Sequence, residues 1–199
     1  MHGSAPSDDD EALIAACIRG DRTAERALFR REYSRVSGTV FRILGSARET
    51  DDLVQETFIA VFRALPQFRR ESRLSTWIDR IAVRVVFQHI AARKRSNLVA
   101  LTAIPEPEDP RGSVDDRAQA REGLRRLYDV LARLKPDART AFALYAIDGR
   151  TIAQVAELTE TTMLTAKLRI WRARREVMRR AAADPVLGAY LAAWAGASR

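Results

Sequence analysis

Apolar residues recur at spacings of three and four along almost the whole chain, whereas strand-type alternation of apolar and polar residues is scarce. Such spacing places apolar side chains on one side of an α-helix, and only nine glycines and seven prolines among 199 residues interrupt it. The sequence therefore predicts an all-α protein, with helices over residues 11–19, 23–44, 51–65, 74–94, 116–134, 138–147, 152–158 and 163–183.

One segment departs from this helical pattern. Residues 101–116 contain Pro105, Pro107 and Pro110 and five carboxylates against a single base, Arg111. Because proline removes helix donors and like charges repel, we expect an extended acidic linker there. The chain then divides into a disordered tail (1–9), a first small helical domain (10–97), the linker (98–118), a second small helical domain (119–183) and an extension (184–199).

The composition narrows the class of protein. With 34 Lys and Arg against 26 Asp and Glu, the chain has a formal net charge of +8, which favours a polyanionic partner. Its 47% hydrophobic and 30% charged residues are typical of a soluble folded protein. One cysteine and two histidines exclude an internal disulfide and a Cys/His zinc site, and no metal or cofactor is expected.

The two ends of the chain give further expectations. The start is acidic where a signal peptide would be basic and then apolar, and no apolar run approaches the roughly 18 residues of a membrane span. The sequence therefore predicts a cytoplasmic protein without membrane insertion. After Asp184 and Pro185, apolar residues predict a short helix that packs on the second domain, with docking of another protein as the alternative.

Two short helices in the second domain are joined by a tight turn. Thr151 and Gln154 form the Thr-x-x-Gln pattern of a capping box, in which both side chains bind free amides at a helix start. The threonine-rich segment 159–162 follows and precedes a second helix that begins near Met163. This arrangement predicts a helix-turn-helix.

The second of these helices has an apolar side and a basic side. Its expected core face contains Met163, Ala166, Ile170, Ala173 and Val177. The other side carries seven cations between residues 166 and 180 against one acid. The first turns of such a helix reach base edges in a major groove, so we predict duplex DNA binding by Thr165, Lys167, Leu168, Trp171 and Arg172. A solvated basic helix, or one that binds RNA, is the alternative.

The helix expected over 51–65 also has two contrasting sides. Its apolar stripe contains Val54, Phe58, Val61, Phe62 and Leu65. The opposite side places an isoleucine among carboxylates and comprises Asp51, Asp52, Gln55, Glu56, Ile59 and Arg63. Such a surface suits a basic protein partner and would repel DNA, whereas an ordinary solvated helix face is the alternative.

The next helix and the segment before it combine aromatic rings with cations. Trp77 and Ile81 are expected to lie in the core. The cations are expected to follow a single DNA strand, because phosphates need neutralising charge and bases stack on flat side chains. These cations are Arg69, Arg73, Arg84, Arg93, Lys94 and Arg95.

Taken together, these segments resemble a known family. Residues 51–58, Asp-Asp-Leu-Val-Gln-Glu-Thr-Phe, are similar to its region 2 core-binding motif, and residues 68–72 and 75–82 are similar to its promoter-melting and minus-ten segment. Residues 149–174 are similar without a gap to its region 4 helix-turn-helix. Over about residues 10–180 the chain resembles the extracytoplasmic-function (ECF) group of bacterial sigma-70-type RNA polymerase sigma factors.

The resemblance implies a non-catalytic initiation factor whose partners are core RNA polymerase, promoter DNA and an anti-sigma protein. It assigns core-polymerase binding to Asp51, Asp52, Gln55, Glu56 and Ile59. It assigns minus-ten binding and melting to Phe68, Arg69, Arg73, Trp77, Arg80, Arg84, Gln88, Arg93, Lys94 and Arg95. It assigns binding of the minus-thirty-five duplex to Thr151, Thr165, Lys167, Leu168, Arg169, Trp171 and Arg172.

The chain also departs from the family pattern. Arg84 stands where the family usually has asparagine, at a position associated with a flipped base. In the helix-turn-helix, Glu160 and Leu164 replace common glycines, Thr162 replaces a proline and Leu168 replaces a serine. Because leucine offers only apolar contacts, we expect the minus-thirty-five preference to differ from the family's usual one.

Two other classes explain part of the pattern. A two-domain repressor would use the basic helix but leave the acidic side of 51–65 unused, and it would bind duplex DNA without polymerase. An enzyme acting on nucleic acid would need a metal–carboxylate or nucleophile constellation, and its activity would respond to divalent metal. Its only clustered candidates are Asp51, Asp52 and Glu56.

Overall fold

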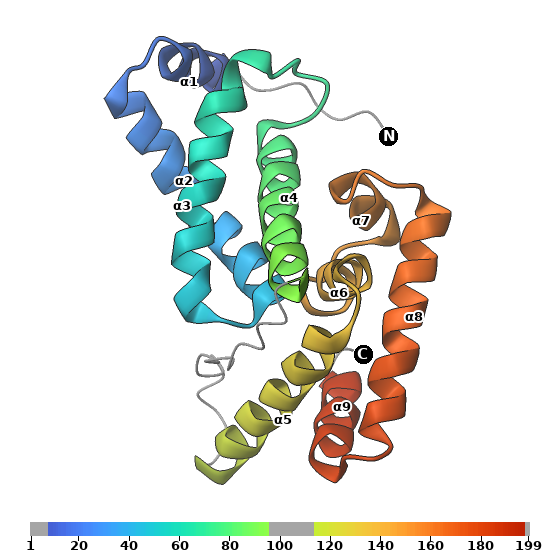
Figure 1. Cartoon of the computed structure of the whole chain (residues 1–199). Coiled ribbons are helices and arrows are strands. Elements are labelled where there is room, and N and C mark those ends of the chain that lie inside the picture. Colours follow the sequence, from blue (N-terminus) through green and yellow to red (C-terminus); the bar gives the residue numbers. More distant parts are fainter. Residues whose placement is uncertain (1–7, 96–113, 198–199) are drawn as a thin grey trace.

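The computed structural model describes residues 8–95 and 114–197, and every regular element in these two stretches is helical, which confirms the all-α prediction (Figure 1). The first stretch is the first lobe, and its elements are α1 (Asp8–Ile18), α2 (Arg22–Leu44), α3 (Ala47–Ala64), the 3-10 turn η1 (Leu65–Gln67) and α4 (Leu74–Arg95). The expected linker lies mostly in residues 96–113, outside the described residues.

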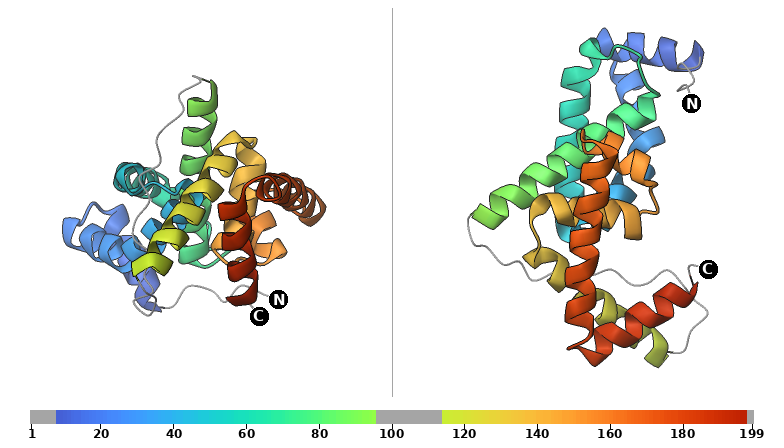
Figure 2. Two further views of the ribbon diagram at one scale, coloured as in Figure 1. Left: turned by 90° about the horizontal axis from the view of Figure 1, so that it is seen from below. Right: turned by 90° about the vertical axis from the view of Figure 1, so that its right-hand side faces the viewer.

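The second stretch is the second lobe. It contains α5 (Val114–Arg133), α6 (Pro136–Phe142), the π-helical turn η2 (Ala143–Ile147), α7 (Ile152–Leu158), α8 (Met163–Ala181) and α9 (Pro185–Ala197). Helices α5, α8 and α9 meet at one end of the molecule, and α6 and α7 lie between α8 and the first lobe (Figure 2).

Local sequence signals set several helix ends. The Asp21 carboxylate accepts hydrogen bonds from the amides of Thr23 and Ala24, which fixes the start of α2. At the start of α7, Thr151 and Gln154 form the predicted capping box. The Thr162 hydroxyl accepts a hydrogen bond from the amide of Thr165 and so begins α8.

The amphipathic pattern of α3 positions the core of the first lobe. Val54, Phe58, Val61 and Leu65 are at most 3% exposed, as the spacing predicts. Trp77 and Ile81 on α4 are half-buried and pack against the same core. Burial of this stripe leaves the opposite side of α3 in solvent.

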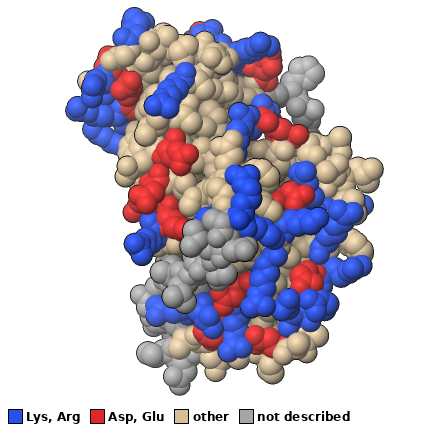
Figure 3. All heavy atoms as spheres, viewed as in Figure 1, with Lys and Arg blue, Asp and Glu red and all other residues tan. Residues whose placement is uncertain are grey.

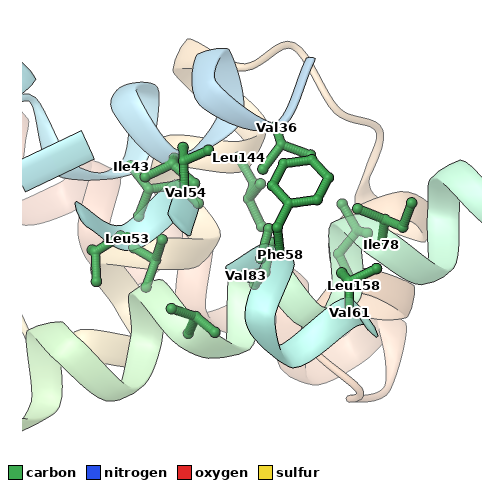
Figure 4. Close-up of a cluster of buried hydrophobic side chains, with 14 of the residues drawn as sticks. Val36, Ile43, Leu53, Val54, Phe58, Val61, Ile78, Val83, Leu144 and Leu158 are labelled. Atoms are coloured by element: carbon green, nitrogen blue, oxygen red, sulfur yellow. The ribbon is translucent and has the colours of Figure 1, made fainter. Parts of the chain in front are cut away.

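The two lobes share one hydrophobic core. Leu144 on η2 and Leu158 on α7 lie among first-lobe side chains such as Val36, Phe58 and Ile78 (Figure 4). All five side chains are at most 4% exposed. Because this burial removes apolar surface of both lobes from water, it favours a closed arrangement of the lobes.

Helix α9 packs against the second lobe, as the sequence predicts for the short helix of the extension. Leu187 and Leu191 are buried in a cluster with α5 and α8. The Asp184 carboxylate accepts hydrogen bonds from the amides of Val186 and Leu187 and so caps α9. The same carboxylate pairs with Arg126 on α5 at 2.8 Å.

Three expectations need correction. Met163 was predicted to face the core but is 59% exposed, because α8 buries only the later positions Ala166, Ile170, Ala173 and Val177. Helix α5 begins at Val114, so residues 114–118 of the expected linker are helical. Helix α1 begins at Asp8, which places the end of the expected N-terminal tail in a helix.

Candidate nucleic-acid and polymerase interface

The side of α3 opposite the core forms an acidic surface. Asp51, Asp52, Gln55 and Glu56 are exposed, and Ile59 beside them is 52% exposed. Acidic atoms gather over α3 in Figure 3. A partner that covers Ile59 must also contact the neighbouring carboxylates of α3, and cations on the partner would neutralise them. This geometry therefore favours a basic protein surface as the partner.

The two aromatic residues of the predicted minus-ten DNA-binding site, Phe68 and Trp77, lie next to each other in the structure. The rings of Phe68 and Trp77 lie 5.1 Å apart in a tilted arrangement, and both side chains are half-buried. Arg69 and Arg73 are exposed on the segment that leads into α4. A flat apolar pair beside exposed guanidinium groups can stack on a base and neutralise phosphates.

The cations of α4 itself are partly occupied by the second lobe. Arg80 pairs with Glu157 at 2.7 Å, and Arg84 pairs with Glu160 at the same distance. Near the end of α4, the Lys94 ammonium donates to the carbonyl oxygen of Leu134 at 2.7 Å. Arg80 and Arg84 therefore pair with the helix-turn-helix, and Lys94 contacts the end of α5.

The remaining predicted residues of this helix differ in exposure. Gln88 and Arg95 are exposed. Arg93 is half-buried and pairs with Glu49 on α3. Most of the predicted cations thus lie along one helix, but the structure does not present them all as one open track.

A cavity of about 300 Å³ separates α4 from the helix-turn-helix. Its lining includes the interlobe pair Arg84 and Glu160, together with Arg80, Arg169 and Thr140. The Thr140 hydroxyl and the Arg80 Nε are buried without a hydrogen-bond partner. The contact between the lobes is therefore incompletely packed and polar at this point.

The outward side of α8 is the most open part of the predicted DNA site. Lys167, Leu168, Trp171 and Arg172 are exposed, and the Arg175 guanidinium lies 5.1 Å from the Trp171 ring. Blue atoms gather along α8 in Figure 3. This side fits the requirement that one helix carries both base-facing and phosphate-facing groups.

The other predicted residues of the helix-turn-helix have partners within the lobe. Arg169 is half-buried and pairs with Asp137 at 3.3 Å. The hydroxyls of Thr165 and Thr162 lie 2.9 Å apart, and the Thr151 hydroxyl accepts the Gln154 amide. These side chains stabilise the turn and the helix starts, which positions α8.

A buried ionic network joins the two lobes. The spacing of residues in the sequence does not predict this network. The side chain of Asp148 on the second lobe is 2% exposed and pairs with Arg42 of the first lobe and with Arg150 at 2.6 Å. Arg150 also reaches Asp79 on α4 at 3.3 Å, and Asp79 pairs with Arg35. Burial raises the pKa of the Asp79 carboxyl, against the opposing effect of Arg35 and Arg150.

One signal for this network was present in the sequence. Asp79 falls in register with Ala82, Val83, Val86 and Ile90, which form the buried stripe of α4. An acid within an apolar helical stripe requires a buried cation, because an unpaired charge there is costly. Its partners come from distant parts of the chain and could not be identified from spacing.

Three further features of the described residues concern metal binding, membrane spans and the cysteine. No group of three or more His, Cys, Asp or Glu side chains within these stretches is placed to hold a metal ion. No helix among residues 8–95 and 114–197 is long and apolar enough to cross a membrane. Cys17 is buried, and this burial raises the pKa of its thiol.

Comparisons with known proteins identify this combination of lobes. The family model "Sigma-70 region 2" matches residues 28–96, and "Sigma-70, region 4" matches residues 124–177. The first match spans the acidic and aromatic-basic surfaces, and the second spans the helix-turn-helix. The chain belongs to the sigma-70 family of RNA polymerase sigma factors, and within it to the ECF group.

Named relatives extend over most of the chain. The RNA polymerase sigma-H factor of Pseudomonas aeruginosa is 29% identical over 183 residues, which cover 85% of this chain and 92% of the relative. The ECF RNA polymerase sigma-E factor of Haemophilus influenzae is 28% identical over 180 residues, covering 84% and 93%.

Two solved structures share the fold. CnrH in complex with the cytosolic domain of CnrY has a TM-score of 0.58 at 24% identity, and the match covers 89% of this chain and 99% of that one. The sigma factor RpoE in complex with the anti-sigma factor NepR from Bartonella quintana has a TM-score of 0.55 at 20% identity, covering 76% and 92%.

Proposed function

We propose that this sigma factor binds core RNA polymerase and directs promoter-specific transcription initiation in the cytoplasm, with a first domain over 10–97 and a second over 119–183. The observation that carries the proposal is the presence, in one chain, of an exposed acidic side on α3 and an exposed basic recognition helix α8. Each surface lies within a matched region of the sigma-70 family. The chain itself performs no bond chemistry in this role.

Each surface has one task in the proposal. The acidic side of α3, with Asp51, Asp52, Gln55, Glu56 and Ile59, binds a basic surface of the polymerase. The Phe68–Trp77 ring pair and the cations around α4 bind the unpaired minus-ten strand, since a bound base offsets part of the cost of unstacking. The outward side of α8 binds the minus-thirty-five duplex.

The closed arrangement of the lobes is not the promoter-bound one in this proposal. Arg80 and Arg84 are paired with Glu157 and Glu160, and a strand of DNA would have to displace these carboxylates. The lobes must therefore separate before α4 receives DNA. Core polymerase is the partner that supplies compensating contacts during this opening.

An anti-sigma protein is a further proposed partner. The two solved structures named above are complexes, one with the cytosolic domain of CnrY and one with the anti-sigma factor NepR. By analogy, such a protein would hold this chain away from the polymerase.

The acidic surface provides the test of polymerase binding. We expect the Asp52→Lys and Glu56→Lys variants to lose affinity for core polymerase by tenfold or more in a pull-down or fluorescence titration, because charge reversal replaces attraction by repulsion. Glu11→Lys, an equal charge change at an exposed position on α1, is the matched control and should bind normally. Unchanged assembly of both α3 variants would contradict the assignment.

If the protein is instead a DNA-binding repressor, we expect different results in binding assays with polymerase and with DNA. A repressor would bind and shift duplex DNA in a mobility-shift assay without polymerase. It would not associate with core polymerase. The exposed acidic side of α3 has no use in that alternative, so the sigma function is the one that accounts for both surfaces.

A further inference from the structure

The outward side of α8 carries a strip of large apolar side chains. Leu164, Leu168 and Trp171 are 77%, 42% and 52% exposed. At about 100° of rotation per residue, these three project within roughly 60° of one another, on the side opposite the buried Ala166 and Ala173. From Leu164 to Trp171 the centre of the exposed side is therefore apolar, and the cation that continues the strip, Arg175, lies against the Trp171 ring.

Cations flank this strip on both sides. Lys167 and Arg174 lie along one edge and Arg172 along the other, and all three are exposed. A major groove presents phosphates on its two walls and base edges between them. The distribution of charge around α8 matches this layout, with cations toward the walls and apolar groups toward the base edges.

The apolar groups restrict what the helix can recognise. Leucine can neither donate nor accept a hydrogen bond, and the only apolar group that unmodified base edges present in the major groove is the C5 methyl of thymine. Leu164 and Leu168 lie one turn apart in the first two turns of α8, directly after the Thr162 cap. These turns are the part of a recognition helix that reaches bases.

We propose that Leu164 and Leu168 read thymine methyl groups in the minus-thirty-five duplex. This inference rests on the proposed sigma function and adds the chemistry of its sequence preference. The minus-thirty-five element of this protein then contains thymine at two neighbouring positions. The two leucines recognise the thymine methyl groups through shape and apolar contact. Lys167 and Arg172 supply affinity from the groove edges.

Deoxyuridine provides a direct test, because it pairs as thymine does but lacks the methyl group. Holoenzyme made from the full chain and core polymerase would first select promoters from a duplex library with a randomised minus-thirty-five block. Each selected thymine would then be replaced by deoxyuridine. We expect affinity to fall about fourfold for each methyl that is read, from the transfer free energy of one buried carbon group.

Two variants make the test specific. Leu164→Ala and Leu168→Ala alter exposed side chains and should bind thymine and deoxyuridine duplexes equally at the position each leucine reads. Lys167→Ala, the control, should weaken binding to both duplexes while the thymine preference of the wild type persists.

The outcomes separate the inference from the function beneath it. A selected element without thymine, or equal binding of thymine and deoxyuridine duplexes by the wild type, would overturn the methyl-reading role and assign the strip to a protein partner. The sigma function would survive that result. If the holoenzyme selected no minus-thirty-five sequence at all, the proposed function itself would fail.

Discussion

The guanidinium of Arg84 on α4 donates a hydrogen bond of 2.7 Å to the carboxylate of Glu160 in the turn of the helix-turn-helix. Glu160 has a backbone φ of 49°, in the left-handed region that glycine occupies most readily. A charged residue therefore holds a turn position that favours glycine, and its side chain reaches the opposite lobe. Glu160 therefore contributes both to the turn of the helix-turn-helix, through its backbone, and to the contact between the lobes, through its side chain.

This relationship gives a prediction for two substitutions of Glu160. Both Glu160→Gly and Glu160→Ala remove the contact to Arg84, but only glycine relieves the left-handed backbone. We expect the glycine variant to be more stable than the alanine variant by about 1 kcal/mol. Urea denaturation monitored by circular dichroism measures the difference. Equal stabilities would show that the turn is not strained.

The buried interlobe network should contribute more to stability than the exposed interlobe pair of Arg84 and Glu160. Arg84 and Glu160 are both more than half exposed, so their pair is worth under about 1 kcal/mol. The side chain of Asp148 is 2% exposed and pairs with two guanidinium groups, those of Arg42 and Arg150. We expect Asp148→Asn to destabilise the protein by about 2 to 3 kcal/mol, because two cations lose their shared anion.

The same denaturation experiment checks the ranking. Arg84→Ala is the comparison variant, since it breaks only the exposed pair. If Asp148→Asn lowers the free energy of unfolding no more than Arg84→Ala does, the buried network does not hold the lobes together.

The interlobe contact also contains a tight steric fit. A side-chain carbon added at Gly45 would lie 2.3 Å from the ring of Tyr128, whose hydroxyl donates to the Arg42 carbonyl oxygen at 2.8 Å. Gly45 has a φ of 67°. We expect Gly45→Ala to destabilise the protein by about 2 kcal/mol or more and to push the second lobe away.

Gly20→Ala separates the two causes. Gly20 has a φ of 80° but no neighbour within 4 Å of an added carbon, so its replacement costs backbone strain alone. Small-angle scattering should show a larger radius of gyration for Gly45→Ala than for Gly20→Ala. Identical scattering profiles and stabilities would mean that Tyr128 does not hold the lobes together.

The ion pairs of Glu122 within α5, one of which shares Arg126 with the start of α9, should weaken in acid. Hydrogen bonds from Arg125 and Arg126 lower the pKa of Glu122 to about 2 from an ordinary value of 4.5, and Arg126 also pairs with Asp184 at the start of α9. A lowered carboxyl pKa stabilises the fold above the ordinary value, and this stability disappears as the pH falls from 4.5 toward 2.

An acid titration of stability at low and high salt measures this effect. Because the groups are exposed, added salt should reduce the effect. Glu122→Gln should flatten this part of the pH profile, whereas a profile unchanged by that substitution would exclude Glu122 as its source.

Periodicity was sufficient to predict the helices and the capping box. The stripe from Val54 to Leu65 and the box of Thr151 and Gln154 depend on residues at most eleven positions apart, and such local signals determine helix faces and ends. Met163 shows the limit, because a helix's first turn can leave the core even when its spacing fits.

The closed arrangement could not be predicted in the same way. Arg42 and Asp148 lie 106 positions apart, and Leu144 reaches its first-lobe neighbours only through tertiary packing. Periodicity reports which face of a helix is apolar but not which partner covers it. For the same reason the cations of α4 were predicted as one DNA-binding set, while the structure pairs Arg80 and Arg84 with the second lobe.

Multi-round run-off transcription tests the central claim most directly. Purified chain would be mixed with sigma-free core polymerase and genomic fragments, and the products compared with those of core enzyme alone. We predict discrete transcripts with common upstream elements, lost in the Asp52→Lys variant and kept in Glu11→Lys. Absence of any specific transcript, with the chain folded and the polymerase active on a control sigma factor, would contradict the sigma function.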